Sequence, residues 1–215
     1  MPGPGTLALL HTSPAHIPVF DALRDEFHPV LRLRHLVAED LLARARVEGP
    51  DAVTGDVRAA LDRAVAEGAG AVLCTCSTIG AVAEAAGAGV PVLRVDRPMA
   101  AAAVAVGPRV VVLATVESTL APTVALVEEE ARRAGRPADV RTFLVDGAFA
   151  RFEAGDTHGC ARLVAKAADA VTDADVIVLA QASMAPAQHL TTTAVPVLAS
   201  PRPGLAAGAD ALHRR

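Results

Sequence analysis

Short β-branched runs alternate with longer, alanine-rich segments along most of the chain. The short runs are typical of strands, and the longer segments have the apolar spacing of helices with glycine near their ends. Strands that alternate with helices favour an α/β fold with a parallel sheet. In the first half, strands are predicted at residues 6–13, 30–37, 71–77 and 90–96.

The second half repeats this pattern. "VPVLRVDRP" at residue 90 matches "VPVLASPRP" at residue 195, an offset of 105, and the same offset places Gln181 against Cys76. The segment from residue 7 matches the segment from residue 110, an offset of 103. Three blocks in one order indicate an internal repeat. The strands of the second set are predicted at residues 109–118, 140–146, 175–183 and 195–201.

The repeat predicts two similar Rossmann-like, parallel-sheet α/β domains. The first covers residues 1–98 and the second covers residues 99–201. A C-terminal helix at residues 202–215 is expected to pack back on the first domain. The ligands of open parallel sheets sit outside the carboxyl ends of the strands. We therefore expect an active site in the cleft between the two domains.

Polar clusters occupy the predicted carboxyl ends of the strands in both halves. Two such halves that face one another would bring all of these clusters to one cleft. The candidate residues in the clusters are Thr12, Ser13, Cys76, Ser77, Thr78, Thr115, Ser118, Thr119, Gln181 and Ser183, and His11 stands beside the first of them.

Composition narrows the choice of partner and compartment. The 215 residues are 52% hydrophobic and 20% charged, which is typical of a folded globular protein. The net charge of −4 comes without a basic block, and Trp and Tyr are absent, so we expect neither a nucleic-acid nor a membrane partner. The sequence pattern leads us to expect neither a secretion signal nor an apolar run of membrane-spanning length. Three cysteines without a framework spacing favour reduced thiols and a cytoplasmic location.

The motifs of common cofactors and metals are absent from the sequence. Cys74 and Cys76 are too closely spaced for the usual zinc pairs, and the histidines are scattered, so no metal is expected. The glycine-rich segments precede strands instead of following them, which argues against a dinucleotide site. Lys166 is the single lysine and is expected to be a solvated helix position, which argues against pyridoxal phosphate. We expect chemistry by side chains alone.

The two neighbouring cysteines are expected to differ. Cys74 lies deeper in its strand and is predicted to be a small core residue. Cys76 ends the strand, and Ser77 and Thr78 are suitable N-cap residues for the helix that follows. A helix N-terminus favours a thiolate, and its free backbone amides can hold a carboxylate. Cys76 is therefore the candidate nucleophile or base.

"CTCSTIG" at residues 74–80 resembles the Cys-(Asn/Ser)-Thr segment of the aspartate/glutamate/hydantoin racemase superfamily. "RVVVLATVEST" resembles the opening of that family's second domain, and "VPVLRVDRPM" resembles its strand-to-interdomain-helix segment. The resemblance covers nearly the whole chain. It implies two α/β domains, cofactor-independent chemistry and, in the racemases, one cysteine from each half beside the substrate α-carbon.

On this sequence the first cysteine of the family maps to Cys76. The second should follow "VIVLA", where Gln181 stands, and a glutamine side chain cannot act as a general acid or base. Gln181 is expected instead to donate a hydrogen bond to a developing enediolate. The positions that hold the carboxylate and amine map to Thr12, Ser13, Ser77, Thr78, Thr115, Ser118 and Thr119.

The resulting hypothesis is a cofactor-independent, racemase-like isomerase that acts on a small carboxylate, an amino acid or a dicarboxylate, through the Cys76 thiolate. Alternatives are a one-cysteine decarboxylase of the arylmalonate decarboxylase type, an isomerase that forms a covalent thioether, and a racemase with a second base other than cysteine. A non-catalytic protein that binds small carboxylates on the same scaffold is the alternative from another class. A homo-oligomer is compatible with each of them.

Overall fold

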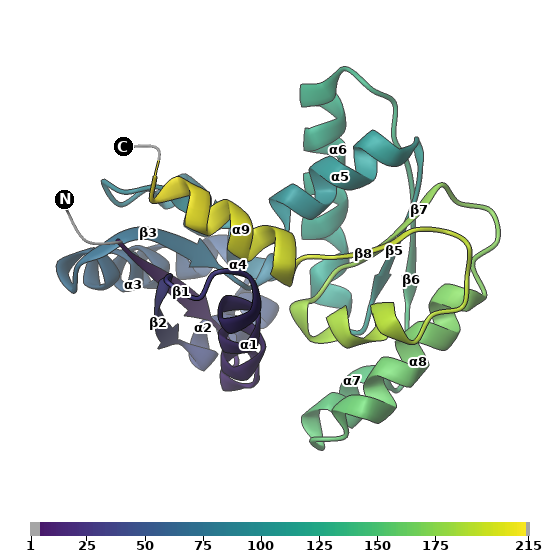
Figure 1. The fold of residues 1–215 in the computed structure, drawn as a ribbon, viewed down its shortest axis with the longest axis horizontal. Coiled ribbons are helices and arrows are strands. Elements are labelled where there is room, and N and C mark those ends of the chain that lie inside the picture. Colours follow the sequence, from purple (N-terminus) through teal and green to yellow (C-terminus); the bar gives the residue numbers. More distant parts are fainter. Residues whose placement is uncertain (1–4, 214–215) are drawn as a thin grey trace. The chain divides into compact units, whose positions relative to one another are not determined.

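The computed structural model describes residues 5–213, and residues 1–4 and 214–215 lie outside the description. The chain forms two compact units (Figure 1). Unit 1 contains the described residues up to Val95 together with those from Pro201 onward. Unit 2 runs from Asp96 to Ser200. The last two residues of the helix predicted at 202–215 are outside the described part.

Unit 1 is built on a parallel sheet of four strands in the order β2-β1-β3-β4. Its strands are β1 Thr6–His11, β2 Arg32–Val37, β3 Ala69–Cys74 and β4 Val92–Arg94. The helices of unit 1 are η1 Pro14–His16, α1 Ile17–Phe27, α2 Glu39–Glu48, η2 Pro50–Val53, α3 Thr54–Ala66, α4 Ser77–Ala86 and α9 Pro201–Ala211.

Helices cover both faces of this sheet. Strand residues such as Leu7 and Leu9 are fully buried with Phe20 of α1 and Leu205 of α9. Their neighbours on β1 point to the opposite face, where they pack with α2, α3 and α4. Because successive side chains of a strand alternate between faces, burial on both sides requires the continuous apolar runs seen in the sequence.

Unit 2 repeats the plan with the strand order β6-β5-β7-β8, again all parallel. Its strands are β5 Arg109–Ala114, β6 Asp139–Leu144, β7 Val176–Leu179 and β8 Val197–Ala199. Its helices are α5 Arg97–Val106, η3 Glu117–Thr119, α6 Leu120–Ala134, α7 Ala148–Glu153, α8 Thr157–Asp169 and η4 Ala182–His189.

The cores of unit 2 also lie on the two faces of its sheet. Val110 and Val112 of β5 pack with α5 and α6. Val111 and Leu113 point the other way, toward α7, α8 and η4. The α6 helix is capped by Gly135, whose positive φ of 62° is a left-handed conformation that favours glycine.

The predicted fold class and internal repeat are confirmed by the two matching sheets. One helix of each unit follows the last strand of the other unit in the chain. The α5 helix follows β4 of unit 1 but packs against α6 and β7 of unit 2, whereas α9 follows β8 of unit 2 and packs against α1 and β3 of unit 1. The chain therefore crosses twice between the units, at residues 95–96 and 200–201.

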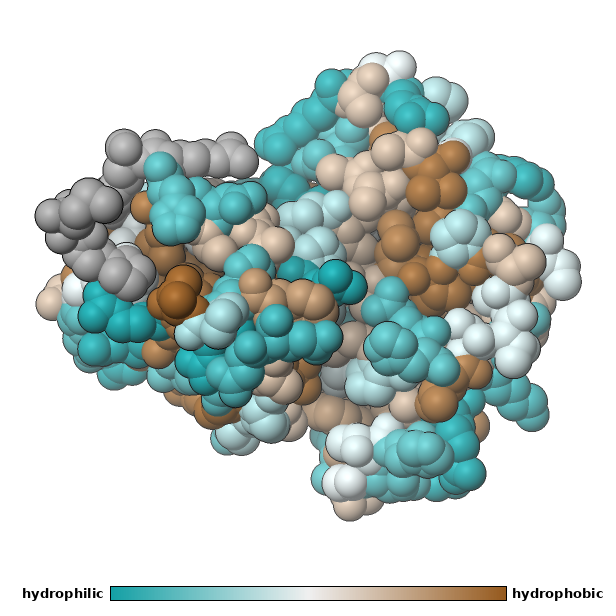
Figure 2. Space-filling view, viewed as in Figure 1, coloured by the Kyte–Doolittle hydropathy of each residue, from teal (hydrophilic) through white to brown (hydrophobic). Residues whose placement is uncertain are grey.

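On the face drawn in Figure 2, hydrophilic side chains cover much of the surface, with apolar side chains gathered in smaller areas between them. Lys166 of α8 is exposed, as the sequence predicted. Among the described residues, none of the helices has the length and apolar character that a membrane span requires. Charged side chains interrupt the apolar positions of the α2 helix, whose two buried residues are Leu41 and Ala45.

Candidate functional site in each unit

Cys76 lies just beyond the carboxyl end of β3 and is the N-cap residue of α4, with an extended backbone (φ −105°, ψ 118°). The helix therefore begins at Ser77, and Ser77 and Thr78 lie inside its first turn instead of capping it. The Cys76 residue is 8% exposed, so a small reagent or substrate can reach only part of it. A thiol at an N-cap lies beside the backbone N–H groups of the first turn, which stabilise negative charge.

The first turn of α4 also presents a buried hydroxyl group. Ser77 and Thr78 are each 4% exposed. The Oγ1 atom of Thr78 is buried and has no hydrogen-bond partner among the described residues. A buried polar atom without a partner costs free energy, and such atoms are often satisfied by a ligand or by water. Thr78 is therefore a candidate contact for a bound carboxylate.

Cys74 and Cys160 are core residues. Cys74 is fully buried among the apolar side chains between β3 and the helices α2, α3 and α4, as predicted. Its Sγ lies 3.6 Å from the carbonyl oxygen of Cys76. Cys160 lies within α8 of unit 2, where burial raises the pKa of its thiol. The strand end at Cys76 thus carries the cysteine best placed to react.

Arg94 is a candidate site residue that the sequence analysis missed. It ends β4, pairs in register with Cys74 of β3, and is 4% exposed despite its charge. A methyl group added at Gly80 would lie 3.0 Å from Arg94 Nε, so the guanidinium packs directly on the first turn of α4. The signal in the sequence was an arginine inside the apolar segment at residues 90–96, which matches Ala199 in the second repeat.

The loop that follows β1 lies beside the loop of Cys76, because β1 and β3 are neighbouring strands. Thr12 is buried, and Ser13 uses its Oγ to accept a hydrogen bond from the backbone N–H of Ala15 at 3.3 Å. Ser13 therefore caps the short helix η1, and this contact is a structural role for a predicted substrate-binding residue.

Three histidines cluster at the same edge of the sheet. His11 is fully buried, and its ring stacks on His35 at a centroid distance of 5.1 Å. The ring of His16 lies 6.2 Å from that of His11. The Nδ1 atom of His16 is buried without a hydrogen-bond partner among the described residues.

Burial controls the protonation of two of these rings. It lowers the pKa of His11 to about 3, with smaller contributions from the charges of His35 and His16. Burial also lowers the pKa of His16 to about 4. Both imidazoles are therefore neutral at pH 7, so each ring has one N–H donor and one acceptor.

In unit 2, Gln181 occupies the place that Cys76 has in unit 1. It follows β7 and is the N-cap residue of η4 with an extended backbone (φ −121°, ψ 143°). Its Oε1 accepts a hydrogen bond from the backbone N–H of Thr115 at 2.6 Å, and its Nε2 donates to Thr115 Oγ1 at 2.8 Å. The expected role of Gln181 as a donor to an enediolate must therefore rest on its second amide hydrogen, since the first is used by Thr115.

The structure brings Gln181 and Thr115 into contact. The other predicted residues of unit 2 are Ser118, Thr119 and Ser183, and each has different surroundings. The Ser118 Oγ is buried without a hydrogen-bond partner among the described residues. Thr119 donates its hydroxyl to the carbonyl oxygen of Val116 at 2.7 Å, a local contact within η3. Ser183 is half-buried in η4. The prediction that the clusters of both units line one cleft stays a prediction.

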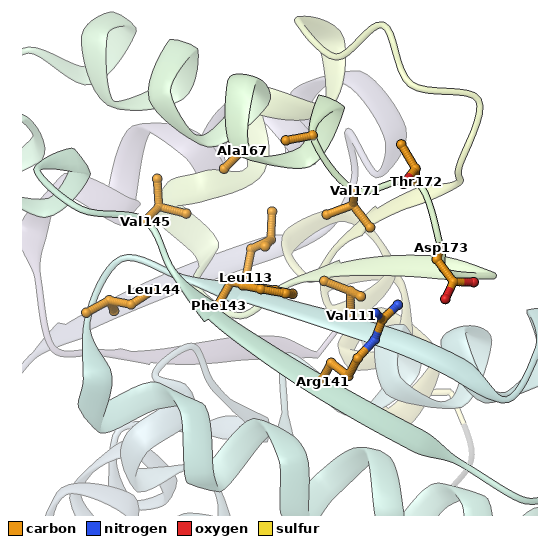
Figure 3. A pocket seen from close by; sticks show the side chains of 11 residues that line it. Val111, Leu113, Arg141, Phe143, Leu144, Val145, Ala167, Val171, Thr172 and Asp173 are labelled. Atoms are coloured by element: carbon orange, nitrogen blue, oxygen red, sulfur yellow. The ribbon is translucent and has the colours of Figure 1, made fainter.

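A separate cavity of about 360 Å³ lies within unit 2, between β5, β6 and the end of α8 (Figure 3). Its lining is mainly apolar, including the exposed side chain of Phe143, with Arg141 and Asp173 at one end. Among the described residues, its lining includes none of the predicted site residues. This cavity therefore does not contribute to the strand-end clusters.

No group of three or more histidine, cysteine or carboxylate side chains among the described residues is arranged to hold a metal ion. The chemistry that the strand ends can support is proton transfer or nucleophilic attack at Cys76, beside donors that suit a carboxylate.

Comparison with known proteins gives structural relatives. No protein-family profile and no curated protein sequence matches the chain. An aspartate racemase from Picrophilus torridus has the same fold with a TM-score of 0.74 and 14% identity, over 98% of this chain and 94% of that one. A glutamate racemase from Bacillus anthracis gives a TM-score of 0.68 and 16% identity, over 97% and 82% of the two chains. An arylmalonate decarboxylase gives 0.60 and 19%, over 96% and 92%. The chain thus has the fold of these proteins over nearly its whole length.

Proposed function

We propose that the protein is a cofactor-independent enzyme of the aspartate/glutamate/hydantoin racemase superfamily that acts on a small carboxylate through Cys76. The observation that carries this proposal is the position of Cys76, which is the N-cap residue of α4 at the carboxyl end of a central strand. The buried Thr78 hydroxyl and the Arg94 guanidinium on the same helical turn support it, because both suit a carboxylate. The shared fold with two racemases and a decarboxylase is consistent with it.

In the isomerase form of the proposal, the Cys76 thiolate removes the proton from the substrate α-carbon. The electron pair of the C–H bond moves into the carboxylate, which becomes an enediolate. The first-turn N–H groups of α4 and Arg94 stabilise the charge that develops on its oxygens. Isomerisation is completed when another acid gives a proton to the opposite face of the carbon, whereas return of the proton from Cys76 to the same face regenerates the substrate.

A decarboxylase is the second candidate, and the contacts of Gln181 favour it. Position 181 carries no acid, and its amide is held by Thr115, so Cys76 is the one cysteine at the two equivalent strand ends. In this form the bond between the α-carbon and a second carboxylate breaks, and carbon dioxide leaves. The electron pair of the broken bond moves into the remaining carboxylate, which becomes an enediolate. The Cys76 thiol then gives its proton to one face of the α-carbon. Such a reaction needs one acid and no second base.

Incubation in deuterated water separates the candidates. The protein is mixed in turn with α-amino acids, dicarboxylates and arylmalonates, and the products are followed by NMR and chiral chromatography. Deuterium at the α-carbon together with the inverted configuration indicates an isomerase. Loss of carbon dioxide with one deuterium in the product indicates a decarboxylase. Ligands that protect Cys76 from iodoacetamide but are never turned over indicate a carboxylate-binding protein and would overturn the proposed enzyme.

A matched pair of variants tests the assignment of Cys76. Cys76→Ala should abolish turnover and ligand-protected alkylation, whereas Cys74→Ala, at the last residue of β3, should retain both. Turnover that persists at the wild-type rate in Cys76→Ala would show that the chemistry is elsewhere.

A further inference from the structure

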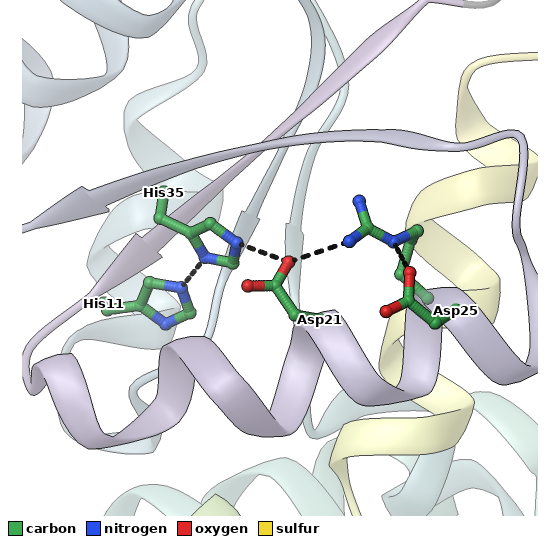
Figure 4. Close-up of polar contacts among 5 residues, drawn as sticks. His11, Asp21, Asp25 and His35 are labelled. Carbon is green, nitrogen blue, oxygen red and sulfur yellow. Dashed lines mark hydrogen bonds and ion pairs between the residues drawn. The ribbon is translucent and has the colours of Figure 1, made fainter.

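A chain of hydrogen bonds runs through unit 1 from the strand end of Cys76 to the surface of α1. His11 Nδ1 lies 2.8 Å from the Oγ1 of Thr75, the residue before Cys76. His11 Nε2 lies 2.8 Å from Nδ1 of His35 (Figure 4). His35 Nε2 lies 3.3 Å from Asp21 Oδ1 on α1. The four side chains, which come from β1, β2, the segment just after β3 and the helix α1, are therefore joined in series.

The burial of this chain changes from one end to the other. Thr75 and His11 are almost completely buried, at 2% and 0% exposure. The side chain of His35 is 16% exposed and that of Asp21 is 39% exposed. Protons of the solvent can reach the chain at Asp21 and His35, whereas the Thr75 end is closed.

The donors and acceptors can be satisfied in two ways. In the first, all rings are neutral: the Thr75 hydroxyl donates to His11 Nδ1, His11 Nε2–H donates to His35, and His35 Nε2–H donates to Asp21. In the second, His35 binds one more proton and donates from both nitrogens, to Asp21 and to His11 Nε2. His11 must then carry its proton on Nδ1 and donate it to Thr75 Oγ1.

The second arrangement requires another acceptor for the Thr75 hydroxyl, and the structure supplies one. Thr75 Oγ1 lies 3.1 Å from the carbonyl oxygen of Leu10. His11 is neutral in both arrangements and changes only its tautomer. This agrees with its buried position, which lowers its pKa to about 3. The two arrangements differ by one proton taken from solvent.

We propose that Asp21, His35 and His11 form a proton relay that acts through Thr75. One proton bound at His35 reverses the direction of every hydrogen bond between His35 and Thr75, and so links the protonation state at α1 to the strand end that carries Cys76. His11 and His35 are positioning residues in this proposal. The regulatory role of the relay rests on the proposed function, because it concerns the same strand end. The relay itself can be measured without a substrate.

The titratable and charged groups around the relay lie on η1, α1 and α9. His16 of η1 lies beside His11, and burial keeps it neutral above a pKa of about 4. Arg24 of α1 lies 3.3 Å from Asp21 and 2.5 Å from Asp25, so its charge is shared between two carboxylates. On α9, which packs against α1, the guanidinium of Arg202 lies 4.1 Å from the centre of the Phe27 ring and so contacts Phe27. Asp21 is thus the carboxylate in direct contact with a relay ring.

The equivalent positions of unit 2 cannot form such a chain. The strand pairing aligns His11 with Ala114, Thr75 with Ala180 and His35 with Thr142. The relay is therefore not required by the fold, since a sheet of the same strand order forms without it.

Histidine NMR tests the relay in the full-length protein. Long-range proton–nitrogen spectra of protein labelled with nitrogen-15 distinguish the Nδ1–H tautomer, the Nε2–H tautomer and the imidazolium. With falling pH we expect His11 to change from Nε2–H to Nδ1–H while it stays neutral. His35 should become an imidazolium with the same midpoint, and the backbone amides of Thr75 and Cys76 should shift with that midpoint. A His11 ring that keeps one tautomer from pH 5 to 9 would overturn the proposal, as would amides at 75 and 76 that do not respond.

Two carboxylate variants of α1 provide a matched comparison. In Asp21→Asn the imidazolium loses its carboxylate partner, so the midpoint should move further than in any variant that leaves this contact intact. Asp25→Asn, which removes a carboxylate bound to Arg24 but not to His35, should leave the midpoint within a few tenths of a unit. Equal shifts in both variants would indicate a general electrostatic effect and overturn the relay.

Substitution of Thr75 tests the far end. Thr75→Val removes the hydroxyl and should abolish the tautomer change of His11, whereas Thr75→Ser should restore it. A Thr75→Val protein with an unchanged tautomer switch contradicts the proposal. These readouts are independent of turnover: an inert Cys76 with an intact relay would count against the proposed function alone, and a reactive Cys76 without the tautomer change would count against the relay alone.

Discussion

The strand ends at Cys76 and Gln181 occupy the same place in two copies of one scaffold. Each follows the third strand in chain order of a sheet with the same topology, and each is an N-cap residue with an extended backbone. The chemistry at the two places is different. Cys76 is a potential acid, base or nucleophile, whereas Gln181 is a neutral amide held by Thr115.

The surroundings of Cys76 also contain more ionisable side chains than those of Gln181. Unit 1 has the buried Arg94 where unit 2 has Ala199, and the buried His11 where unit 2 has Ala114. The helix after Cys76 is an α-helix, while the helix after Gln181 is a 3₁₀ helix that contains Pro186. The repeat thus preserves backbone geometry, while ionisable groups are concentrated at one of the two strand ends.

Removing the thiol should have the strongest consequence. Cys76→Ala should lower turnover by at least about 100-fold, because general acid–base groups typically contribute about 10² to 10⁴. The fast, ligand-protected alkylation by iodoacetamide should be lost with it, and mass spectrometry of the alkylated peptides measures the rate at each cysteine. Cys74→Ala is the control and should keep the fast reaction, since Cys74 lies in the core. The opposite result would assign the reactive thiol to Cys74.

Making the two strand ends alike is the next test. If both serve one substrate, Gln181→Cys should restore an acid at the second position and raise α-proton exchange with inversion by about 10². Gln181→Ser, which also breaks the contacts with Thr115 but adds no comparable acid, is the control. Chiral chromatography in deuterated water measures the exchange. Equal gains in both variants would mean that release of Thr115, and not a new acid, causes the change.

Removing the charge at position 94, where unit 2 has Ala199, should weaken carboxylate binding. Arg94→Met keeps most of the side-chain volume but removes the charge, and the loss of a charge-assisted hydrogen bond is worth about 1.5 to 3 kcal/mol. The concentration of a dicarboxylate that protects Cys76 from alkylation should therefore rise by about 10- to 100-fold. Arg58→Met, which changes an exposed arginine of α3 paired with Asp62, is the control and should not alter protection. An unchanged protection constant in Arg94→Met would remove Arg94 from the site.

The helix α9 gives a stability test of unit 1. A methyl group at Gly204 would lie 2.4 Å from the carbonyl oxygen of Val95, a contact with backbone that cannot move aside. Gly204→Ala should therefore lower the free energy of unfolding by about 1 to 3 kcal/mol. The same substitution at Gly55 of α3, where a methyl group meets no atom within 4 Å among the described residues, should raise it by about 0.5 to 1 kcal/mol. Urea denaturation measures both, and equal effects would contradict the close packing of α9.

The last test concerns the pH dependence of stability. Burial lowers the pKa of His16 to about 4, below the 6.5 of the unfolded chain. The unfolded state therefore binds a proton first as the pH falls, and stability is complete above pH 6.5 and declines toward pH 4. His16→Asn should reduce this decline by at most about 1.4 kcal/mol per pH unit. Urea denaturation at pH 7, 6 and 5 gives the slope, and a slope equal to that of the wild type would show that His16 is not held neutral.

The strands, their alternation with helices and the repeat could all be predicted from the order of the amino acids. Buried parallel strands require continuous apolar runs, and these can be recognised one by one in a single sequence. The repeat then aligned Cys76 with Gln181, and the strand pairing of the two sheets confirms that alignment. Cys74 was correctly assigned to the core because it lies within such a run.

Other features depend on contacts between residues that are distant in the sequence, so they became visible only in the folded chain. The relay joins residues 11, 21, 35 and 75. They come together because β1 lies between β2 and β3, and because α1 packs on the face of the sheet that carries Leu7 and Leu9. Arg94 contacts Gly80 through the pairing of β3 with β4. Gln181 meets Thr115 because β5 and β7 are neighbours. Local patterns specify which segments become strands and helices, but side chains 60 or more positions apart meet only after the strand order is set.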